Sequence, residues 1–497
     1  PLAMIVICIF FVPIFSRLKV YTAYEYLENR FDSKTRTLTS FLFLLQRGLS
    51  TGISVFAPSI ILSSLFGWNI YYTNILMGGL LIIYTMSGGA KAVAYTQQLQ
   101  LIIIFTGMFL AAYMVVNMLP DNVSFTDALE VSGKMGKLNV ITTGFENGKF
   151  NWSDQYNLFS GLIGGFFLAL SYFGTDQSQV GRYLTAKSLK QSRMGLLMNG
   201  FVKIPMQFGI LLIGVLVFSF YQFNKAPIFF NDVQLKKLES SVYKDSLVIA
   251  TTQYEAITTL KQKAVVDYSA ASDINDKTAK AASMNTLEGL QKKSDSLRKS
   301  VKGWLASKEV GGDNNDTNYI FLRFVVDNLP VGLVGLLIAI IFLASWGSIA
   351  AAINSLASCT MIDFHRRFTK KKDTEETEYK LSKKYTLAWG IFCIIVAMFT
   401  YNVGNSLIEA VNVLGSLFYG VILGVFLVAF MFKNIKSGHV VFWGAVLAEV
   451  LVLTVFILTK VGVFKMGFLW LNPIGAFGVI IFSLILNKII PKKIALN

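Results

Sequence analysis

The chain has 497 residues, of which 54% are hydrophobic and 15% are charged, and its formal net charge is +16. A soluble globular domain carries about 25% charged residues, so this composition excludes an ordinary soluble protein. Three cysteines are too few for a disulfide scaffold, and 41 phenylalanines with 20 tyrosines exclude a disordered chain, so we expect an all-α polytopic membrane protein.

Eleven apolar segments approach or reach the roughly 20 residues that a helix needs to cross a membrane. They are 1–16, 38–66, 69–88, 95–118, 157–178, 194–221, 331–361, 385–403, 406–432, 439–460 and 467–488. The first begins at Pro1 without a methionine or a charged lead-in, so it is neither a signal peptide nor a full span. We expect the chain to be a fragment that lacks its true N-terminus.

Basic residues in the loops predict the orientation. Alternate loops, beginning with 17–37 and ending with the tail after 487, hold 23 lysines and arginines, whereas the short loops between them hold five. The positive-inside rule places the first set, and the C-terminus, in the cytoplasm, which implies an integral protein of a plasma (inner) membrane. The net charge is then a topology signal, and we expect a lipid bilayer rather than a nucleic acid as partner.

Two basic residues fall inside apolar segments. Arg47 and Lys203 each lie about nine residues into a segment, roughly 13 Å deep at 1.5 Å per residue. A charge at such a depth requires a partner or water, unless the side chain snorkels to the headgroups. Glu409, near the outer end of 406–432, is the acid that we place at comparable depth.

Small and polar residues cluster at the end of segment 157–178. Four glycines there accompany Tyr172, Asp176 and neighbouring polar side chains. Such a composition allows a helix to break where it faces a cavity, as in secondary transporters. Close helix packing, with Asp176 already at the cytoplasmic surface, is the alternative.

Residues 222–318 differ from the rest of the chain because they are rich in lysine, aspartate, serine and alanine. By alternation this segment lies outside the cell. Leucines and a valine recur at helical spacing over 287–305, which indicates an amphipathic helix and a docked two-helix hairpin. A solvated insertion without a ligand is the alternative. The membrane domain then comprises 1–221 and 319–497.

Segment 331–361 carries small and hydroxyl residues along its second half. Hydroxyl groups and freed backbone carbonyls supply the oxygens that a hard cation prefers, without a buried carboxylate. Tight helix packing through small residues accounts for the same composition.

Catalytic patterns are missing from the sequence. Its two histidines, His365 and His439, lie at the polar edges of apolar segments, and no nucleophile, metal-binding or phosphate-binding motif stands out. We predict no catalytic residue, no enzyme activity and no organic cofactor.

Four stretches resemble the sodium/solute symporter family. They are YTAYEYLENRF (21–31), SGGAKAVAYTQQLQ (87–100), TDQSQVGRYLTAKS (175–188) and INSLASCTMIDF (353–364). TGISVFAPSIILSSLFG (51–67) is further similar to the iodide and multivitamin transporter branch. The resemblance covers nearly the whole chain outside 222–318. It implies the LeuT-type fold, with two inverted five-helix repeats plus extra helices, and a missing first helix.

The resemblance also implies an ion site in segment 331–361. The family's sodium ligands there match the carbonyl of Ala344 and the side chains of Gly347 and Ser348, and only Ser348 keeps a hydroxyl. Na+ is then the expected coupling ion, held at Ala344 and Ser348. We expect no second sodium site, because Gln97 replaces the aspartate that it requires in other members.

Residues for a solute follow from the same resemblance. Tyr172 matches an aromatic inner gate, and Lys203 matches a substrate-side lysine of sugar transporters. Asn412 lies beside the position of a sugar-binding glutamine, which is Val411 here. Arg47 and Lys203, with few intramembrane acids, favour a small polar or anionic solute over a neutral sugar.

These features together predict sodium-coupled import of a small organic solute by alternating access. Gly347 leaves open proton coupling, or weak sodium coupling, as the main variant. A membrane sensor is the second alternative, although we expect no output domain because the chain ends nine residues after Lys488.

Overall fold

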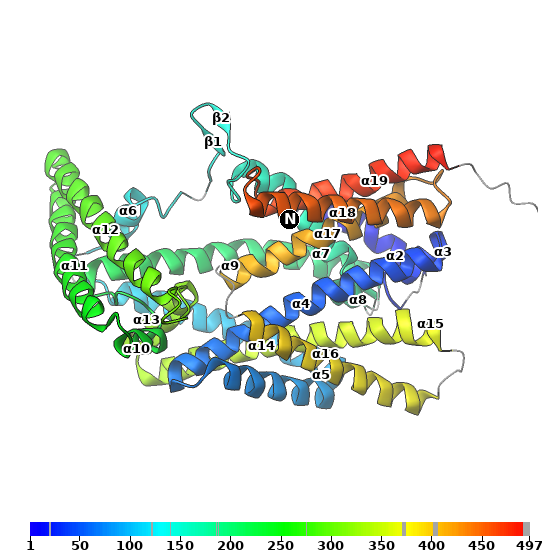
Figure 1. The fold of residues 1–497 in the computed structure, drawn as a ribbon, viewed down its shortest axis with the longest axis horizontal. Helices are drawn as coiled ribbons and strands as arrows, with labels where there is room; N and C mark the ends of the chain where they lie inside the picture. The colour runs from blue at the N-terminus through cyan, green and yellow to red at the C-terminus, as the bar shows by residue number, and fades with distance from the viewer. Residues whose placement is uncertain are drawn as a thin grey trace, which may run out of the picture.

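The computed structural model describes the chain except residues 19–20, 121–122, 140, 185, 187, 275, 370–373, 401–405 and 491–497, and it leaves out the side chains of 18, 88–99, 184 and 273 as well. Its described part is mainly helical, and most helices run along the long axis of the molecule (Figure 1). One short antiparallel hairpin joins β1 (Phe145–Glu146) to β2 (Lys149–Phe150), with Phe145 opposite Phe150. The expected all-α architecture is confirmed.

The helices follow one another along the chain with short connections. Up to the insertion they are α1 (Leu2–Val6), η1 (Ile7–Phe11), α2 (Val12–Leu18), α3 (Glu25–Arg30), α4 (Ser33–Phe66), α5 (Ile70–Asn117), α6 (Phe125–Lys134), η2 (Ser160–Gly164), α7 (Gly165–Thr175), α8 (Gln177–Leu184) and α9 (Leu189–Phe223). They continue with α10 (Asp232–Glu239), α11 (Lys244–Asp273), α12 (Lys277–Leu305), η3 (Thr317–Tyr319), α13 (Ile320–Asn328), α14 (Val331–Cys359), η4 (Thr360–His365), α15 (Arg366–Phe368), α16 (Glu375–Thr400), α17 (Leu407–Met431), α18 (Gly438–Val461), η5 (Phe468–Trp470) and α19 (Leu471–Ile489).

Within the described residues, nine helical stretches are long and apolar enough to cross a membrane, and the shorter apolar helices Leu2–Arg17 and Ser160–Thr175 bring the set to eleven. Two of the nine, Ile70–Ser87 and Gln100–Asn117, belong to α5. Each of the eleven segments predicted from the sequence coincides with one of these stretches. The largest shift is in α16, which begins ten residues earlier than predicted because its first turns are polar.

Helix ends follow ordinary capping rules. The side chain of Asp32 accepts a hydrogen bond from the backbone N–H of Thr35 and thereby starts α4. Gly67 ends the same helix at φ 67°, a left-handed conformation that glycine adopts without a Cβ penalty. Because α4 begins at Ser33, Arg47 lies farther from its start than the sequence suggested.

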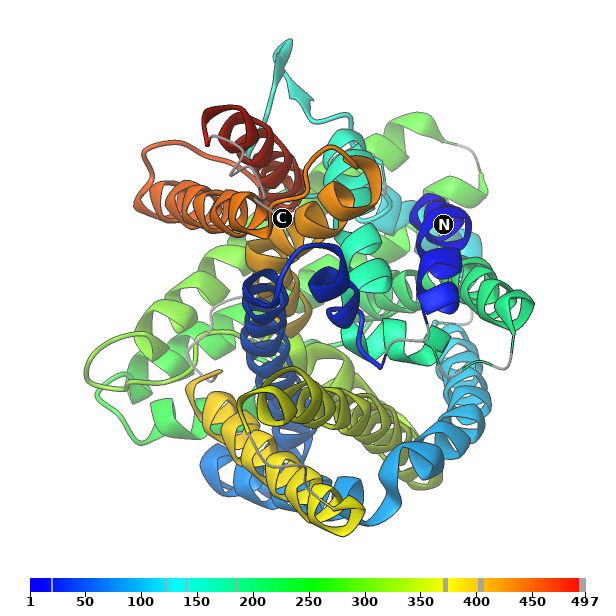
Figure 2. The ribbon, with the colours of Figure 1, turned by 90° about the vertical axis from the view of Figure 1, so that its right-hand side faces the viewer.

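The spanning helices form two packed groups. The helices α17, α18 and α19 lie on one side of the molecule, and α5, α14 and α16 lie on the opposite side (Figures 1 and 2). Glycines allow close approach in the first group, because a Cβ at Gly420 would collide with the backbone of Asn472 and one at Gly475 would meet Gly420. The helix α4 contacts α17 and α18 as well as α5, α14 and α16, so it links the two groups.

The insertion folds as a helical hairpin. The helices α11 and α12 pack against each other at the end of the molecule opposite α3 and α15 (Figure 1). Arg298 and Lys302 of α12 pair with the buried carboxylate of Asp316 at 2.5 and 3.0 Å. Lys280 contacts Glu130 of α6 at 2.7 Å, which ties the hairpin to the short helix between α5 and η2.

Candidate functional site

A helix break organises the first polar cluster. The helix α7 ends at Thr175, and Asp176 adopts an extended conformation (φ −72°, ψ 122°) before α8 begins at Gln177. Asp176 is 1% exposed, and its Oδ1 accepts hydrogen bonds from the backbone N–H and the hydroxyl of Ser178 at 2.7 and 2.5 Å. The carboxylate is thus buried at the break and not at a surface.

Two further groups reach the second oxygen of Asp176. The hydroxyl of Tyr419 on α17 donates a hydrogen bond to Oδ2 at 2.6 Å. The Nη1 atom of Arg47 on α4 lies 3.9 Å from the same oxygen, which is an ion pair without a hydrogen bond. Charge compensation and hydrogen bonding of Asp176 therefore come from three separate helices.

Arg47 itself retains unused hydrogen-bonding capacity. Its side chain is 14% exposed, and its Nε is buried without a partner. A guanidinium has five N–H donors, and the Nε–H of Arg47 makes no hydrogen bond to another described residue, whereas the Tyr172 side chain is a hydrogen-bond partner of the group. The carbon at the centre of the group lies 5.7 Å from the centroid of the Tyr172 ring. Arg47 is therefore held by the charge of Asp176 and by Tyr172, and it keeps hydrogen-bonding capacity for a ligand.

Tyr172 stands between these groups. Its hydroxyl accepts a hydrogen bond from Nε2 of Gln179 at 2.8 Å, and its ring lies 6.0 Å from that of Tyr419. The structure therefore brings together Arg47, Tyr172 and Asp176, which the sequence singled out. Gln179 and Tyr419 complete the cluster. Gln179 lies in the quoted TDQSQ stretch, whereas Tyr419 sits in an apolar run that offered no signal.

Lys203 and Asn412 are less closely connected to this cluster. The ammonium of Lys203 on α9 lies 5.5 Å from the centroid of Phe173, the neighbour of Tyr172. Neither an ion pair nor a hydrogen bond joins Lys203 to another residue that the structure describes. Asn412 is partly buried on α17 and likewise makes no hydrogen bond within the described part of the chain.

The residues assigned to sodium lie on α14. Ala344 and Ser348 are one turn apart, with Ser348 exposed and Gly347 buried. A Cβ at Gly347 would lie 2.5 Å from Oε1 of Gln100 on α5, so this carboxamide fills the space of a side chain at 347. Gln97 belongs to residues 88–99, whose side chains lie outside the description.

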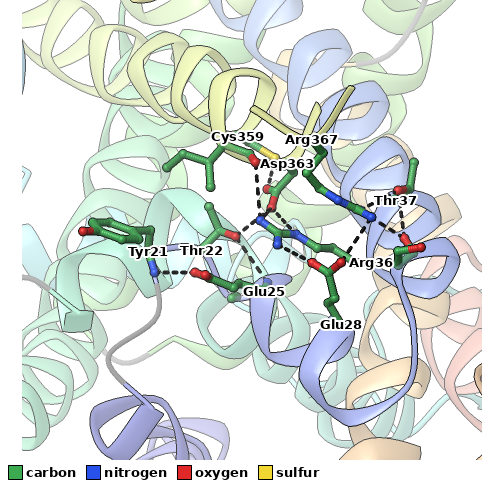
Figure 3. Close-up of polar contacts among 12 residues, drawn as sticks. Tyr21, Thr22, Glu25, Glu28, Arg36, Thr37, Cys359, Asp363 and Arg367 are labelled. Carbon is green, nitrogen blue, oxygen red and sulfur yellow. Dashed lines mark hydrogen bonds and ion pairs between the residues drawn. The ribbon is translucent and has the colours of Figure 1, made fainter. Parts of the chain in front are cut away.

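A second polar cluster joins the segment before α4 to the end of α14 (Figure 3). Nε of Arg36 donates to Oδ1 of Asp363 at 2.7 Å, and its Nη1 donates to Oε2 of Glu28 at 2.6 Å. The side chains of Arg36 and Asp363 are 6% and 0% exposed. This ion pair is therefore shielded from solvent, where charge interactions are strong.

Three neighbours extend this group. Thr22 donates to Oδ1 of Asp363 at 2.9 Å, and the thiol of Cys359 donates to Oδ2 at 3.0 Å. Arg367 lies 3.2 Å from Glu28 and donates to the Thr37 hydroxyl. We call Thr22, Glu28, Arg36, Cys359, Asp363 and Arg367 the Arg36 cluster. Two of the quoted motifs contain four of its members, but the sequence did not show that these motifs meet.

One intramembrane acid escaped the sequence analysis. Glu409 was placed as the acid at depth, yet Glu449 lies in the middle of α18. Both of its carboxyl oxygens are buried and have no hydrogen-bond partner within the described structure. Its position as a charged residue inside the apolar segment 439–460 is the signal that could have found it.

Comparison with known proteins decides the family. The sequence model of the Sodium:solute symporter family matches residues 1–239 and 299–464. The chain belongs to this family. Residues 240–298, which form most of the hairpin of α11 and α12, lie outside the match. The resemblance inferred from the four motifs is thereby confirmed.

Individual relatives and a solved structure agree with this assignment. The sodium-dependent multivitamin transporter of Oryctolagus cuniculus is 24% identical over 85% of the chain, and the sodium/sialic acid symporter SiaT of Proteus mirabilis is 24% identical over 87%. A solved outward-open, substrate-bound Na+-coupled sialic acid symporter is 20% identical, with a TM-score of 0.69 over 99% of the chain and 82% of its own. This likeness confirms the LeuT-type fold.

The chain spans only part of the length of its curated relatives. It covers 52% of the length of the multivitamin transporter and 69% of that of SiaT. The family and these relatives are transporters and not enzymes, as the sequence predicted.

Proposed function

We propose that the protein is a secondary active transporter that imports a small anionic organic solute together with Na+. The observation that carries the proposal is Arg47. It is a permanently charged group beside a helix break inside the membrane-spanning part, and its Nε makes no hydrogen bond to a described residue. A planar guanidinium matches a carboxylate in two-point hydrogen bonding, so an organic acid suits this site.

Asp176 does not remove this capacity. Its oxygens already accept hydrogen bonds from Ser178 and Tyr419, and it stands 3.9 Å from the guanidinium. It therefore offsets the charge of Arg47 and orients it without occupying its donors. In this proposal the Tyr172 ring packs against the solute, and Lys203 and Asn412 lie farther along its path.

Sodium is the proposed coupling ion. We assign it to α14, with the carbonyl of Ala344 and the hydroxyl of Ser348 as ligands and Gly347 at the position of the missing hydroxyl. The relatives named above are sodium-dependent by their descriptions. Gly347 favours one alternative, a protein that is coupled weakly to sodium or coupled to protons, because the site has one oxygen fewer.

Alternating access supplies the mechanism in this proposal. Coupling requires that ion and solute each favour one conformation of the protein. Tyr172 is the proposed inner gate for the solute. The Arg36 cluster lies at the end of the molecule that holds the basic loops. We propose that it keeps this end closed while the opposite end is open.

The proposed orientation follows from charge. Loops rich in lysine and arginine lie in the cytoplasm of a plasma (inner) membrane, together with the C-terminus. The hairpin of α11 and α12 stands at the opposite end and is then extracytoplasmic. The membrane domain comprises 1–221 and 319–497 on either side of this insertion.

Uptake into proteoliposomes tests the function. Labelled monocarboxylates, acidic sugars, amino acids and neutral sugars are offered with an inward sodium gradient, with potassium as control. Uptake of an anionic solute that requires sodium is the expected result. Uptake driven only by a pH gradient would support the proton-coupled alternative. Binding of a solute without any uptake would support a membrane sensor.

A further inference from the structure

Glu449 occupies an unusual position for an acid. It is the twelfth of 24 residues in α18, so about 17–18 Å of helix separates it from either end at 1.5 Å per residue. Half the thickness of a hydrocarbon core is about 15 Å. A side chain that starts at this depth is too short to bring a carboxylate to either headgroup layer.

Among the described residues, none forms a hydrogen bond or an ion pair with the carboxylate of Glu449. Both carboxyl oxygens are buried without a hydrogen bond to a described residue. The helix α18 packs on α19, α17 and α4. Near Glu449 on α18, Ala445, Ala448 and Val452 are fully buried and apolar.

Charged groups on the packed helices are engaged elsewhere or lie near helix ends. On α4, Arg36 pairs with Asp363 and Glu28, and Arg47 pairs with Asp176. The remaining charged or titratable residues of the four helices are Lys34, Tyr419, Glu409, His439, Lys460 and Lys488. Tyr419 donates its hydroxyl to Asp176, and the others lie within three residues of a helix end. None of them pairs with Glu449 within the described structure.

The other buried acids of the spanning part differ in this respect. Asp176 accepts hydrogen bonds from Tyr419 and Ser178, and Asp363 is bonded to Arg36. An ionised carboxylate is tolerated inside a membrane when it is paired or hydrogen-bonded in this way, and an isolated one becomes protonated instead.

We propose that Glu449 is a proton-binding site in the membrane, where it is kept as a neutral carboxylic acid at pH 7. This makes it a modification site for hydrophobic carbodiimides. The acid proton moves to a carbodiimide nitrogen, and a carboxyl oxygen adds to the carbodiimide carbon to give an O-acylisourea. Acyl transfer from oxygen to nitrogen then yields a stable N-acylurea, with no leaving group and no further reactant.

Infrared spectroscopy tests the protonation directly. The spectrum of the protein at pH 7 is compared with that of the E449Q variant, which has nearly the same shape and no titratable group. We expect a carbonyl band of an un-ionised carboxylic acid that is lost in E449Q and retained in the matched variant E409Q. A spectrum in which E449Q removes a carboxylate band instead overturns the proposal.

Labelling tests the modification. The reconstituted protein is treated with dicyclohexylcarbodiimide at pH 7, and its peptides are analysed by mass spectrometry. An adduct on the peptide that contains Glu449 is expected, with loss of that adduct in E449Q, its retention in E409Q, and a decline at alkaline pH as the acid ionises. A water-soluble carbodiimide should leave Glu449 unmodified. Equal labelling by both reagents, or no adduct at Glu449 at any pH, contradicts the proposed site.

Discussion

At the residue scale, the candidate site depends on which neighbours satisfy the buried acid Asp176 and which satisfy the buried base Arg47. Ser178 and Tyr419 donate the hydrogen bonds that Asp176 accepts. Arg47 therefore balances the charge of Asp176 without donating a hydrogen bond to it. This division gives a neutral pair that still presents a guanidinium to a ligand. The sequence identified both residues because charges are rare in apolar segments, but it contained no information about Tyr419.

The role of Arg47 is tested by substitution. Arg47→Gln removes the charge and the two-point donor, and hydrogen bonds to a charged group contribute about 1.5–3 kcal/mol, so binding of an anionic solute should weaken by about tenfold or more. Arg47→Lys should recover only part of this affinity. The measurement is equilibrium binding in sodium, with the exposed Lys190→Gln as a matched control. Equal weakening for a neutral solute would contradict a direct contact with the anion.

Gly347 and Gln100 provide a second test at this scale. A serine at 347 would place its Cβ 2.5 Å from Oε1 of Gln100, so Gly347→Ser should destabilise the protein by about 1–3 kcal/mol through overpacking. Gln100→Ala makes room for the new side chain, so the double variant should recover stability relative to Gly347→Ser. Thermal unfolding in a fixed detergent measures both effects. Simple additivity of the two substitutions would show that these side chains do not compete for space.

At the element scale, the Arg36 cluster connects segments that are distant in the sequence. The residues around Thr22 and Glu28 precede α4, whereas Cys359 and Asp363 lie at the junction of α14 and η4. The π-helical turn η4 places Asp363 next to Arg36, and such turns are frequent at functional positions. The sequence revealed the two motifs, but their contact depends on tertiary packing across more than 300 residues.

The reactivity of Cys359 reports whether this cluster is open or closed. Its thiol is fully buried and donates to Asp363, so a maleimide reaches it only when the cluster opens. Arg36→Gln leaves a buried carboxylate without its cation, and removal of one partner of such a pair costs about 3–5 kcal/mol. We expect faster labelling of Cys359 in this variant.

The labelling experiment uses a background in which Cys8 and Cys393 are replaced by serine. Arg17→Gln, which removes an exposed charge of α2, is the matched control and should leave the rate unchanged. An unchanged rate in Arg36→Gln would mean that the cluster does not hold this end of the molecule closed.

At the scale of the whole molecule, hydropathy sufficed to predict the apolar spans, whereas the LeuT-type fold followed from the resemblance to the family. Eleven apolar segments coincide with helices because a span must be long, apolar and continuous. The four motifs predicted the family because they occur along the chain in the order that the family has. What could not be predicted is which side chains meet between helices, since one apolar face resembles another in sequence. Tyr419, which meets Asp176 from another helix, is an example.

The insertion carries a pH-sensitive group at its base. Burial, together with the nearby charge of Asp316, raises the pKa of the Asp313 carboxyl to about 6. A group with a raised folded-state pKa binds more protons when folded, so its ionisation lowers stability as pH rises from about 4 to about 6. Asp313→Asn should therefore be more stable than the native protein above this window and should match it at the acidic end. Thermal unfolding across this range measures the difference, and parallel curves for the two proteins would contradict it.

The central claim is that one protein couples sodium to an anionic solute held at Arg47. Equilibrium binding tests it most directly, with the solute found in the uptake panel titrated at several sodium concentrations and sodium titrated at several solute concentrations. Linkage requires that each ligand strengthen the other by the same factor. The account predicts equal factors greater than one in the native protein, and weakened solute binding in Arg47→Gln at every sodium concentration. Solute affinity that is identical in sodium and potassium would contradict it.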